Sequence, residues 1–471
     1  MLKCIQSMHS NVKARVRCGS KLTQFINCSA GVKQGDISSP VLFSLFINEL
    51  ALKVIENGKH GVTFPLDPFE LFILLLADDV VLLSETIIGL QTQINSLKDA
   101  SNTLGLQINM DKSNIVVFRK GGYLSAREKW FYDGKVVNAY KYLGIYLTTR
   151  LSFVTTCKDL TSKAKRALLC IIRKLYSLNN RSLSLFLKLF DVQIQPIVQY
   201  GSEIWGLDKA AVNCEKLHTF ALKKFLGVDI RTPNDFVYGK LDRYPIDINS
   251  IGNCLRFWLK LTQMDCQRIP RKAYNMLVNL DEKGKITWVT NVRVCLFQYG
   301  FGFVWVNQGV GDVKSFLKMF KERLIDCRWQ NWQEHIQESQ RFSVYKQFNS
   351  NHCVKTYLLE HLDYQLRFLM AKFRLGVSDI NVHFYRHRNN SEKDLLCPLC
   401  NKHKEDEVHF VLCCPFYENM RRELIAEKYF RNPNTFKFNI LMASESTTTT
   451  RKLAIYLYKA FKLRKLLISQ F

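Results

Sequence analysis

The chain has 471 residues, which is enough for about three domains, and it is strongly basic. It carries 67 lysines and arginines against 41 aspartates and glutamates, a formal charge of +26. Such an excess predicts a polyanionic partner, most often nucleic acid. The longest strongly apolar run, around 71–77, stops at two aspartates and is too short for a membrane helix. The N-terminus begins no signal peptide, so the 15 cysteines are expected to be reduced.

A glycine-flanked loop precedes the first strongly helical segment. Gly31 and Gly35 stand on either side of Gln34, where the backbone can bend and approach a ligand closely. Ser38 or Ser39 can cap the helix that follows, with a proline in its first turn. A loop that leads into a helix presents backbone donors that suit a phosphate or nucleotide. An ordinary loop and cap is the simpler interpretation of this block on its own.

Two adjacent carboxylates, Asp78 and Asp79, lie between the apolar runs 71–77 and 80–83. Short aliphatic runs of this kind predict buried strands joined by a tight turn. Two carboxylates beside buried strands are costly unless a positive charge neutralises them. A divalent metal that carries phosphate would do so. A chance acidic hairpin turn is the alternative, because aspartate favours turns.

Two further sequence blocks follow, and the order of all four blocks makes the pattern specific. Residues 104–113 read Gly-Leu-x-x-Asn-x-x-Lys from Gly105, ending at Lys112, and 142–147 is an alternating strand. The four blocks, in this order, resemble the palm of reverse transcriptases, and the likeness is closest to the non-LTR (LINE-type) retrotransposon branch. It runs from about Met1 to Leu147, and a weaker likeness continues to the C-terminus.

The resemblance implies a role for each block. Asp78 would bind metal, supported by Asp79, at a site that clamps two Mg²⁺ ions about 3.5–4 Å apart. Lys112 would lie near the triphosphate and help protonate the departing pyrophosphate, unless it is an ordinary surface lysine. The family usually has an aromatic residue where Leu76 stands, a mild departure because both are apolar. Nucleotide and template binding is implied for Gly31, Gln34, Gly35, Ser39 and Pro40, and a primer grip for Tyr142, Leu143 and Gly144.

One part of the family's palm is not recognisable. An earlier strand with another essential metal-binding aspartate should stand several dozen residues before Gly31. The first thirty residues contain no Asp or Glu, and they resemble the helix and hairpin that follow that strand. We therefore expect an inactive, N-terminally truncated fragment that lacks the fingers and the first catalytic carboxylate. No endonuclease is recognisable either, so the missing part is expected to include that domain.

Beyond the palm the pattern becomes helical. Apolar residues recur at helical spacing from Asp159 to Leu178, with basic residues on the other face, and 182–200 repeats the pattern up to Pro196. The resemblance makes this region a thumb along the primer–template duplex. A solvated basic face is the alternative for the cations that would contact phosphates, which are Lys163, Lys165, Arg166, Arg173 and Lys174.

Later aromatic residues carry weaker signals. Trp205 and Tyr238 lie in segments that resemble post-thumb parts of these elements, and we expect both to be packing residues. Between Asp363 and Leu375, arginines alternate with aromatic residues, a composition that suits single-stranded nucleic acid. We favour an amphipathic helix that docks on its own domain.

The second specific motif is Cys397, Cys400, His409 and Cys414, with the spacing Cys-x2-Cys-x8-His-x4-Cys. Two cysteines in one turn, with a histidine and a cysteine from the next element, form a tetrahedral zinc site. Cys413 could replace Cys414, although the Cys414-Pro order fits the family better. The set resembles the C-terminal zinc knuckle of LINE-type proteins, with unmetallated thiols as the alternative. One of the acidic residues at 405–407 could orient the imidazole.

The expected fold is α+β, with a partial reverse-transcriptase palm, a mostly helical thumb, a helical C-terminal region and a small zinc knuckle. The expected function is RNA-templated DNA synthesis by two-metal nucleotidyl transfer in the full-length enzyme. Its partners would be an RNA template, a DNA primer and dNTP, and its cofactors Mg²⁺ and Zn²⁺. A remnant that binds nucleic acid through thumb and knuckle without catalysis is the alternative. A retrotransposon protein of this kind is expected in the nucleus and cytoplasm, without secretion or membrane insertion. The expected domains are palm 1–150, thumb and post-thumb 151–245, a helical basic region 246–390, CCHC knuckle 391–425 and helical tail 426–471.

Overall fold

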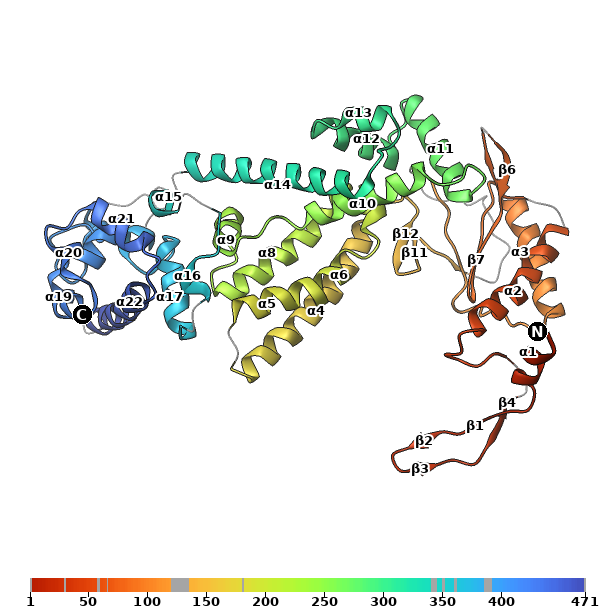
Figure 1. Cartoon of the computed structure of the whole chain (residues 1–471), viewed down its shortest axis with the longest axis horizontal. Coiled ribbons are helices and arrows are strands. Elements are labelled where there is room, and N and C mark those ends of the chain that lie inside the picture. The colour runs from red at the N-terminus through yellow and green to blue at the C-terminus, as the bar shows by residue number, and fades with distance from the viewer. Residues whose placement is uncertain are drawn as a thin grey trace. The chain divides into compact units, whose positions relative to one another are not determined.

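The computed structural model describes residues 2–28, 31–56, 60–65, 67–119, 135–179, 182–339, 345–349, 352–359, 362–384 and 392–469. These form two compact units. The first comprises Met1–Lys141, Leu147–Leu151 and Cys266–Asn279, and the second comprises Tyr142–Tyr146, Ser152–Asp265 and Leu280–Phe471. In the described chain, the named strands all lie between Val12 and Thr148, and helices dominate the residues after Thr148 (Figure 1). This is the α+β composition that the sequence predicts.

The first unit is built from helices and short antiparallel ribbons. Its helices are α1 (Leu2–His9), α2 (Ser39–Glu56), α3 (Ile87–Thr103) and part of α11 (Ile269–Glu282). The antiparallel pairs are β1 (Val12–Ala14) with β4 (Ile26–Cys28), β2 (Arg17–Cys18) with β3 (Lys21–Leu22), β5 (Val62–Phe64) with β6 (Asp67–Leu71), and β7 (Ile73–Leu76) with β8 (Asp79–Leu82). One pair is parallel, β9 (Asn114–Ile115) with β10 (Lys135–Val136).

A small core in this unit supports the β7–β8 hairpin. Ile47 and Leu50 of α2 are buried against Ala100 of α3, and Leu75 and Val80 of the hairpin pack on this cluster. The two helices therefore hold the hairpin through the Leu75–Val80 pair, one pair before its tip, and the exposed tip itself lies outside the core. Apolar burial of this kind is the main stabilising contribution available to such a short ribbon.

Among the described residues of the second unit, the named strands are confined to the tip of one hairpin, and helices make up most of the rest. That hairpin pairs β11 (Ala139–Tyr142) with β12 (Ile145–Thr148). The helices up to residue 262 are α4 (Val154–Ser177), α5 (Leu183–Leu189), α6 (Gln195–Val198), α7 (Ser202–Trp205), α8 (Val212–Leu226), α9 (Asn234–Leu241) and α10 (Asp247–Thr262). The later helices are α12 (Trp288–Gln298), α13 (Gly302–Val306), α14 (Val313–Glu338), α15 (Tyr345–Phe348), α16 (Thr356–Leu359), α17 (Tyr364–Arg374), α18 (Asn381–Phe384), α19 (Glu418–Leu424), α20 (Glu427–Phe430), α21 (Thr435–Ala443) and α22 (Thr447–Ile468).

The predicted amphipathic helix after the palm is α4. It begins at Val154, five residues before the predicted start at Asp159, and ends at Ser177. Its buried residues include Leu160, Ala164 and Leu168, which pack against α5, α6 and α8. The helical spacing of apolar residues therefore identified the buried face correctly, because this periodicity is a local property of the sequence.

The helical pattern expected for 182–200 up to Pro196 is divided in the structure and continues past that proline. A π-helical turn over Phe190–Ile194 joins α5 to α6, and Pro196 lies in the first turn of α6. Proline has no N–H to donate, so it is tolerated where a new helical segment begins. In the π-helical turn, the N–H of Gln195 donates to the carbonyl of Phe190. This turn is wider than an α-helical one, and α6 begins directly after it.

The C-terminal residues form one core. Buried Cys397, Phe410 and Cys414 belong to the same apolar cluster as Phe373 of α17 and Tyr456 of α22. The phenol of Tyr456 donates a hydrogen bond to the carbonyl of Phe410 at 2.8 Å. Within the described part of the chain, the segments 391–425 and 426–471 therefore share one core, although the sequence suggests a separate knuckle and tail.

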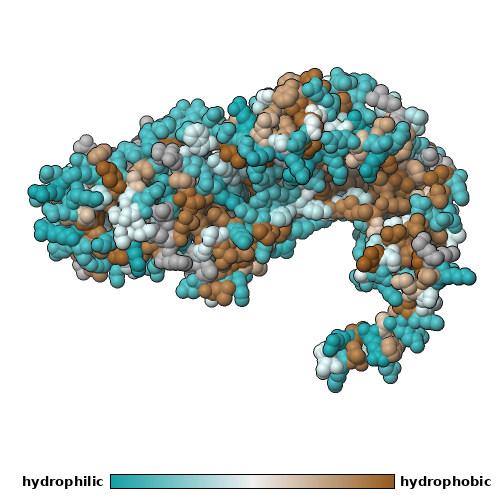
Figure 2. Space-filling view, viewed as in Figure 1, coloured by the Kyte–Doolittle hydropathy of each residue, from teal (hydrophilic) through white to brown (hydrophobic). Residues whose placement is uncertain are grey.

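Two surface features complete the description. None of the helices in the described ranges is long and apolar enough to span a bilayer. On the face drawn in Figure 2, hydrophilic side chains alternate with apolar ones, and apolar side chains are exposed around α12 and α13, among them Phe297, Phe303 and Val306.

Candidate nucleic-acid and metal sites

The acidic pair lies at the tip of the β7–β8 hairpin. Leu76 pairs with Asp79, so the connecting loop is Ala77 and Asp78. Ala77 has a left-handed backbone with φ of 52°, which a residue with a side chain adopts at a cost of about 1 kcal/mol or more. Strained backbone of this kind is often found at functional positions. The tight turn that the sequence predicts is therefore present.

Both carboxylates are exposed, and the strands beside them are only half-buried. The expectation of costly carboxylates beside buried strands is thus wrong, because α2 and α3 contact the hairpin only up to the Leu75–Val80 pair and leave its tip open. Among the described residues, the only cluster of three or more potential metal ligands is the one at Cys397. Asp78 and Asp79 therefore lack a third close ligand in this part of the chain.

The glycine-flanked loop has the backbone conformation that its sequence predicts. Gly31 and Gly35 have φ values of 84° and 88°, a region open to glycine and strained for other residues. Gln34 between them is exposed. The loop thus places an exposed amide side chain, with flexible backbone on both sides, before the N-terminus of α2.

The two serines of this loop are used differently from the prediction. Helix α2 starts at Ser39 with Pro40 in its first turn, as expected. The hydroxyl of Ser39, however, donates to the carbonyl of Lys33 at 2.6 Å, and that of Ser38 donates to Asp36 at 2.9 Å. These bonds point back into the loop and brace it. Hydrogen bonds from the backbone and side chain of Ser38 lower the pKa of Asp36.

Lys112 lies at the end of a turn that Asn109 organises. The side-chain oxygen of Asn109 accepts a hydrogen bond from the backbone N–H of Lys112 at 3.2 Å. Tyr140 and Asn114 donate to the carbonyl of Lys112 at 3.2 and 3.1 Å. The backbone is thereby fixed while the side chain stays exposed. The Asn-x-x-Lys spacing thus has a structural basis in the turn itself.

The β11–β12 hairpin turns through Leu143 and Gly144, whose φ values are 48° and 84°. Two positive φ values in a two-residue loop indicate the type I′ turn that suits the twist of hairpins. Tyr200 fixes this tip: its hydroxyl donates to the carbonyl of Leu143 at 2.9 Å. A Cβ added to Gly144 would lie only 2.8 Å from the Tyr200 ring. The predicted primer-grip residues Tyr142, Leu143 and Gly144 thus form one hairpin tip, with Tyr200 as a contact that the sequence did not predict.

The basic face of α4 is open at four of its five predicted positions. Lys165, Arg166, Arg173 and Lys174 are exposed. Lys163 differs, because its ammonium forms an ion pair with Asp159 at 3.0 Å one turn earlier. Part of the attraction of Lys163 for a phosphate is therefore already offset.

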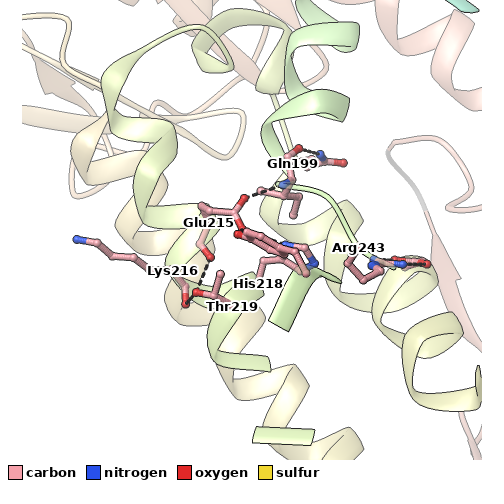
Figure 3. Close-up of polar contacts among 9 residues, drawn as sticks. Gln199, Glu215, Lys216, His218, Thr219 and Arg243 are labelled. Carbon is pink, nitrogen blue, oxygen red and sulfur yellow. Dashed lines mark hydrogen bonds and ion pairs between the residues drawn. The ribbon is translucent and has the colours of Figure 1, made fainter. Parts of the chain in front are cut away.

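A polar network behind α4 was not predicted. Glu215 of α8 accepts hydrogen bonds from Tyr238 at 2.5 Å and from the backbone N–H of Ile246 at 2.6 Å, and it pairs with His218 at 3.0 Å (Figure 3). Burial alone would raise the pKa of Glu215, but bonds from His218, Tyr238 and Ile246 outweigh it and lower that pKa. Gln199 and Arg243 extend the network to Ile246 and Asp191. It ties α8 to the start of α10, and no local sequence signal marks it, because its members are far apart in the chain. Trp205 and Tyr238 are buried, as the sequence predicts.

The Cys/His cluster is assembled in the C-terminal core. The ligand atoms of Cys397, Cys400, His409 and Cys414 all lie within 4.8 Å of one another. The Sγ atoms of Cys397 and Cys414 are 3.9 Å apart, and Cys400 Sγ is 3.4 Å from His409 Nε2. A tetrahedron with Zn–S bonds of about 2.3 Å has ligand separations of about 3.8 Å. The donor set and its spacing therefore fit a tetrahedral zinc ion.

The spacing between the last two ligands has a structural cause. Residues His409–Cys413 form a π-helical turn, in which the N–H of Cys414 bonds to the carbonyl of His409 at 2.8 Å. This i to i+5 closure brings side chains five residues apart to the same side of the turn. Cys413 is exposed and lies outside the ligand cluster, so the geometry favours Cys414 as the fourth ligand. The hydrogen bond between Cys397 and Cys414 lowers the pKa of the Cys397 thiol to about 3 and raises the pKa of the Cys414 thiol.

The acidic residues at 405–407 brace the cluster from outside. Glu405 is fully buried and forms an ion pair with Arg464 of α22 at 2.8 Å. Asp406 accepts from the backbone N–H of His409 at 2.7 Å, and Glu407 pairs with His383 at 2.7 Å. Asp406 thus supports His409 through its backbone, where the sequence suggested a contact to the imidazole.

Parts of the sequence are similar to known proteins. The family model "Reverse transcriptase (RNA-dependent DNA polymerase)" matches residues 2–147. The Pol polyprotein of the R2 element of Popillia japonica is 23% identical over 249 residues, which cover 50% of this chain and 39% of the relative. The RNA-directed DNA polymerase of the mobile element jockey of Drosophila melanogaster is 23% identical over 189 residues, 38% of this chain and 20% of the relative.

A third relative matches a shorter stretch with higher identity. The Pol polyprotein of element R2DM of Drosophila melanogaster is 34% identical over 130 residues, 25% of this chain and 12% of the relative. The chain thus spans well under half the length of these curated relatives. Residues 2–147, which the family model matches, contain the hairpin of Asp78 and Asp79, the glycine-flanked loop and Lys112. They identify in this chain a reverse transcriptase domain of the non-LTR retrotransposon type.

Proposed function

We propose that this chain provides palm and thumb elements of an RNA-directed DNA polymerase, which copies the RNA of a retrotransposon into DNA. The observation that carries the proposal is the exposed Asp78–Asp79 pair on the tip of a supported hairpin inside the matched region. Exposed, adjacent carboxylates are suitable oxygen ligands for Mg²⁺, which is bound in polymerases together with substrate phosphates.

In this proposal each chain element near the reaction has one task. Asp78 supplies a metal-binding carboxylate, and Asp79, at the first position of β8, supports it. When bound, the metal stabilises the charge that develops on the transferred phosphoryl group. Lys112 offers an exposed ammonium to the leaving pyrophosphate from a turn that Asn109 fixes. The nucleotide and template contact the loop residues Gly31, Gln34, Gly35, Ser39 and Pro40, and the primer end lies at Tyr142, Leu143 and Gly144.

Within the described ranges, the carboxylates gathered at the hairpin tip, Asp78 and Asp79, are too few for a complete two-metal site. Such a site needs ligands on both ions, and within the described ranges no third ligand joins Asp78 and Asp79. We therefore propose that synthesis depends on a further carboxylate from a palm strand outside these residues. Residues 1–471 alone are then expected to give no templated extension.

The Cys/His cluster is proposed as a structural zinc site. Its four ligands leave no position for a substrate, which is typical of structural zinc. Because its residues share a core with α17 and α22, zinc would stabilise the whole C-terminal part of the chain.

The test is primer extension on an RNA template with a version of the protein that also carries the further palm strand. Asp78→Asn removes the charge at nearly constant shape. It is expected to lower incorporation at least about 100-fold, because losing a direct metal ligand should cost at least as much as losing a partner of such a ligand. Asp99→Asn, an exposed aspartate on α3 in the same unit, is the matched control and should leave incorporation unchanged. Equal activity of the Asp78→Asn variant and the parent would sink the proposal.

A second candidate function is nucleic-acid binding without catalysis. It is favoured by the missing third ligand together with the exposed cations on α4. Templated extension by residues 1–471 that is lost on Asp78→Asn would reject this candidate, whereas binding without extension in every version of the protein would favour it.

A further inference from the structure

An aromatic and basic surface lies where the C-terminal end of α4 meets α8 and α17. It surrounds a cavity of about 20 Å³, lined among others by Tyr176, Lys224, Phe225, Tyr364 and Arg367. That volume holds about one water molecule, so a larger ligand must contact the outer parts of the rings. Tyr176 offers such a surface, with 40% of the residue exposed.

Three rings form what we call the aromatic ladder: Tyr176, Tyr364 and Phe368. Tyr176 and Tyr364 meet edge to face, with centroids 6.2 Å apart. Tyr364 and Phe368 lie nearly parallel, at 21° and 6.1 Å, one turn apart on α17. The ring of Phe368 packs on Gly227, where a Cβ would lie only 2.2 Å away. The contact of Phe368 with Gly227 therefore holds the ladder in place on the side of α8, while its rings stay partly exposed.

Cations surround the aromatic ladder. Lys372 lies one further turn along α17, with its ammonium 4.6 Å from the centre of the Phe368 ring. Arg173, three residues before Tyr176 on α4, is exposed, and Lys224 is exposed on α8. The acidic neighbours are already engaged: Asp363 caps α17 through the N–H of Gln365, and Asp229 pairs with Arg231. The surface thus combines partly exposed rings with an excess of positive charge.

We propose that this surface binds an unpaired stretch of a nucleic-acid strand, whose bases stack on the aromatic ladder and whose phosphates contact Lys224 and Lys372. Protein grooves for single strands combine these two features. The inference rests on the proposed function and adds to it a single-stranded partner beyond the duplex-facing part of α4. Stacking distinguishes neither base nor sugar, so RNA and DNA strands are both expected to bind.

The experiment measures binding of the full chain to a 12-nucleotide oligouridine, to its deoxythymidine counterpart and to a blunt RNA–DNA hybrid. The variant Tyr176→Leu/Tyr364→Leu keeps apolar packing but removes both stacking rings. We expect it to bind each single strand about tenfold more weakly and the hybrid as the parent does. The salt slope should stay unchanged, because stacking releases no counterions.

Tyr176→Phe/Tyr364→Phe is the matched control, because it keeps the rings and should bind single strands like the parent. Thermal unfolding and hybrid binding show whether each variant is folded. Parental single-strand affinity in the Leu variant would overturn the inference, as would an equal loss on the hybrid in a variant with parental unfolding. Neither result depends on polymerisation, so failure here is distinguishable from failure of the proposed function.

Discussion

At the scale of single residues, Cys413 and Cys414 show how a shift of one position decides whether a cysteine joins the Cys/His cluster. Both follow His409 within one π-helical turn, but only Cys414 is buried with its Sγ in the cluster. The sequence allowed either spacing, and Cys414 was preferred only because the Cys-Pro order fits the resemblance to the family better. The choice depends on the width of the turn, which the sequence does not reveal.

This difference gives a prediction for metal content. The full chain should carry one zinc ion, Cys414→Ser should lose it, and Cys413→Ser should keep it, because a ligand is removed only in the former. Metal analysis of the purified proteins measures this directly. The Cys414→Ser protein should also unfold at a lower temperature, because metal binding and folding are coupled at such sites. Two variants with equal zinc, or an unchanged unfolding transition of the parent after chelation, would exclude the zinc site.

At the scale of elements, the features that depend on local pattern were predictable. The apolar spacing of α4, the turn between β7 and β8 and the Cys/His spacing are all contained in short stretches of sequence. The π-helical turns at 190–194 and 409–413 and the burial of Arg367 and Arg374 were not. These arise from tertiary partners, as where Arg374 lies over the ring of Tyr357 and donates to the carbonyl of Met442. Helix α17 accordingly docks through its arginines, in agreement with the amphipathic interpretation of 363–375.

The same distinction applies to the candidate sites. The pattern located Asp78, Lys112 and the Cys/His ligands, because motif spacing is written in the chain. It could not show that the acidic pair is exposed or that Asp159 engages Lys163. It also could not show that Tyr200 holds the tip of the β11–β12 hairpin, since this contact joins residues 57 positions apart.

The contact between Tyr200 and the hairpin tip gives an element-scale prediction. Gly144→Ala should destabilise the second unit by about 1–3 kcal/mol, because it combines strain at positive φ with a clash against the Tyr200 ring. Gly284→Ala is the matched control: its φ is 74° with no atom within 4 Å, so only the backbone strain of about 1 kcal/mol remains. In a Tyr200→Ala background, the cost of Gly144→Ala should fall to that of the control. Urea unfolding of the parent and the four variants measures these costs, and equal costs of Gly144→Ala in both backgrounds would show that the ring is not responsible.

At the scale of the whole molecule, the effect of the total charge of +26 has to be distinguished from the effect of where the cations lie. Any strongly basic protein attracts nucleic acid, and phosphate contacts by lysine and arginine are blind to sequence. A thumb-like role for α4 requires more, namely that its own cations account for a definite share of the released counterions. Lys163 should contribute least, because Asp159 already pairs with it.

Replacing Lys165, Arg166, Arg173 and Lys174 with alanine should therefore weaken binding to an RNA–DNA hybrid and flatten its salt dependence. Each lost phosphate contact reduces the slope of log K against log salt by about 0.9, so four contacts reduce it by roughly 3–4. Lys163→Ala should change the slope less than any one of the four. The matched control replaces four other exposed lysines of the second unit, Lys283, Lys285, Lys318 and Lys321, with the same change in net charge. If that control flattens the slope as much, binding follows the overall charge, and α4 has no special part in it. If only the α4 variant does so, the nucleic acid lies along this helix, as a thumb requires.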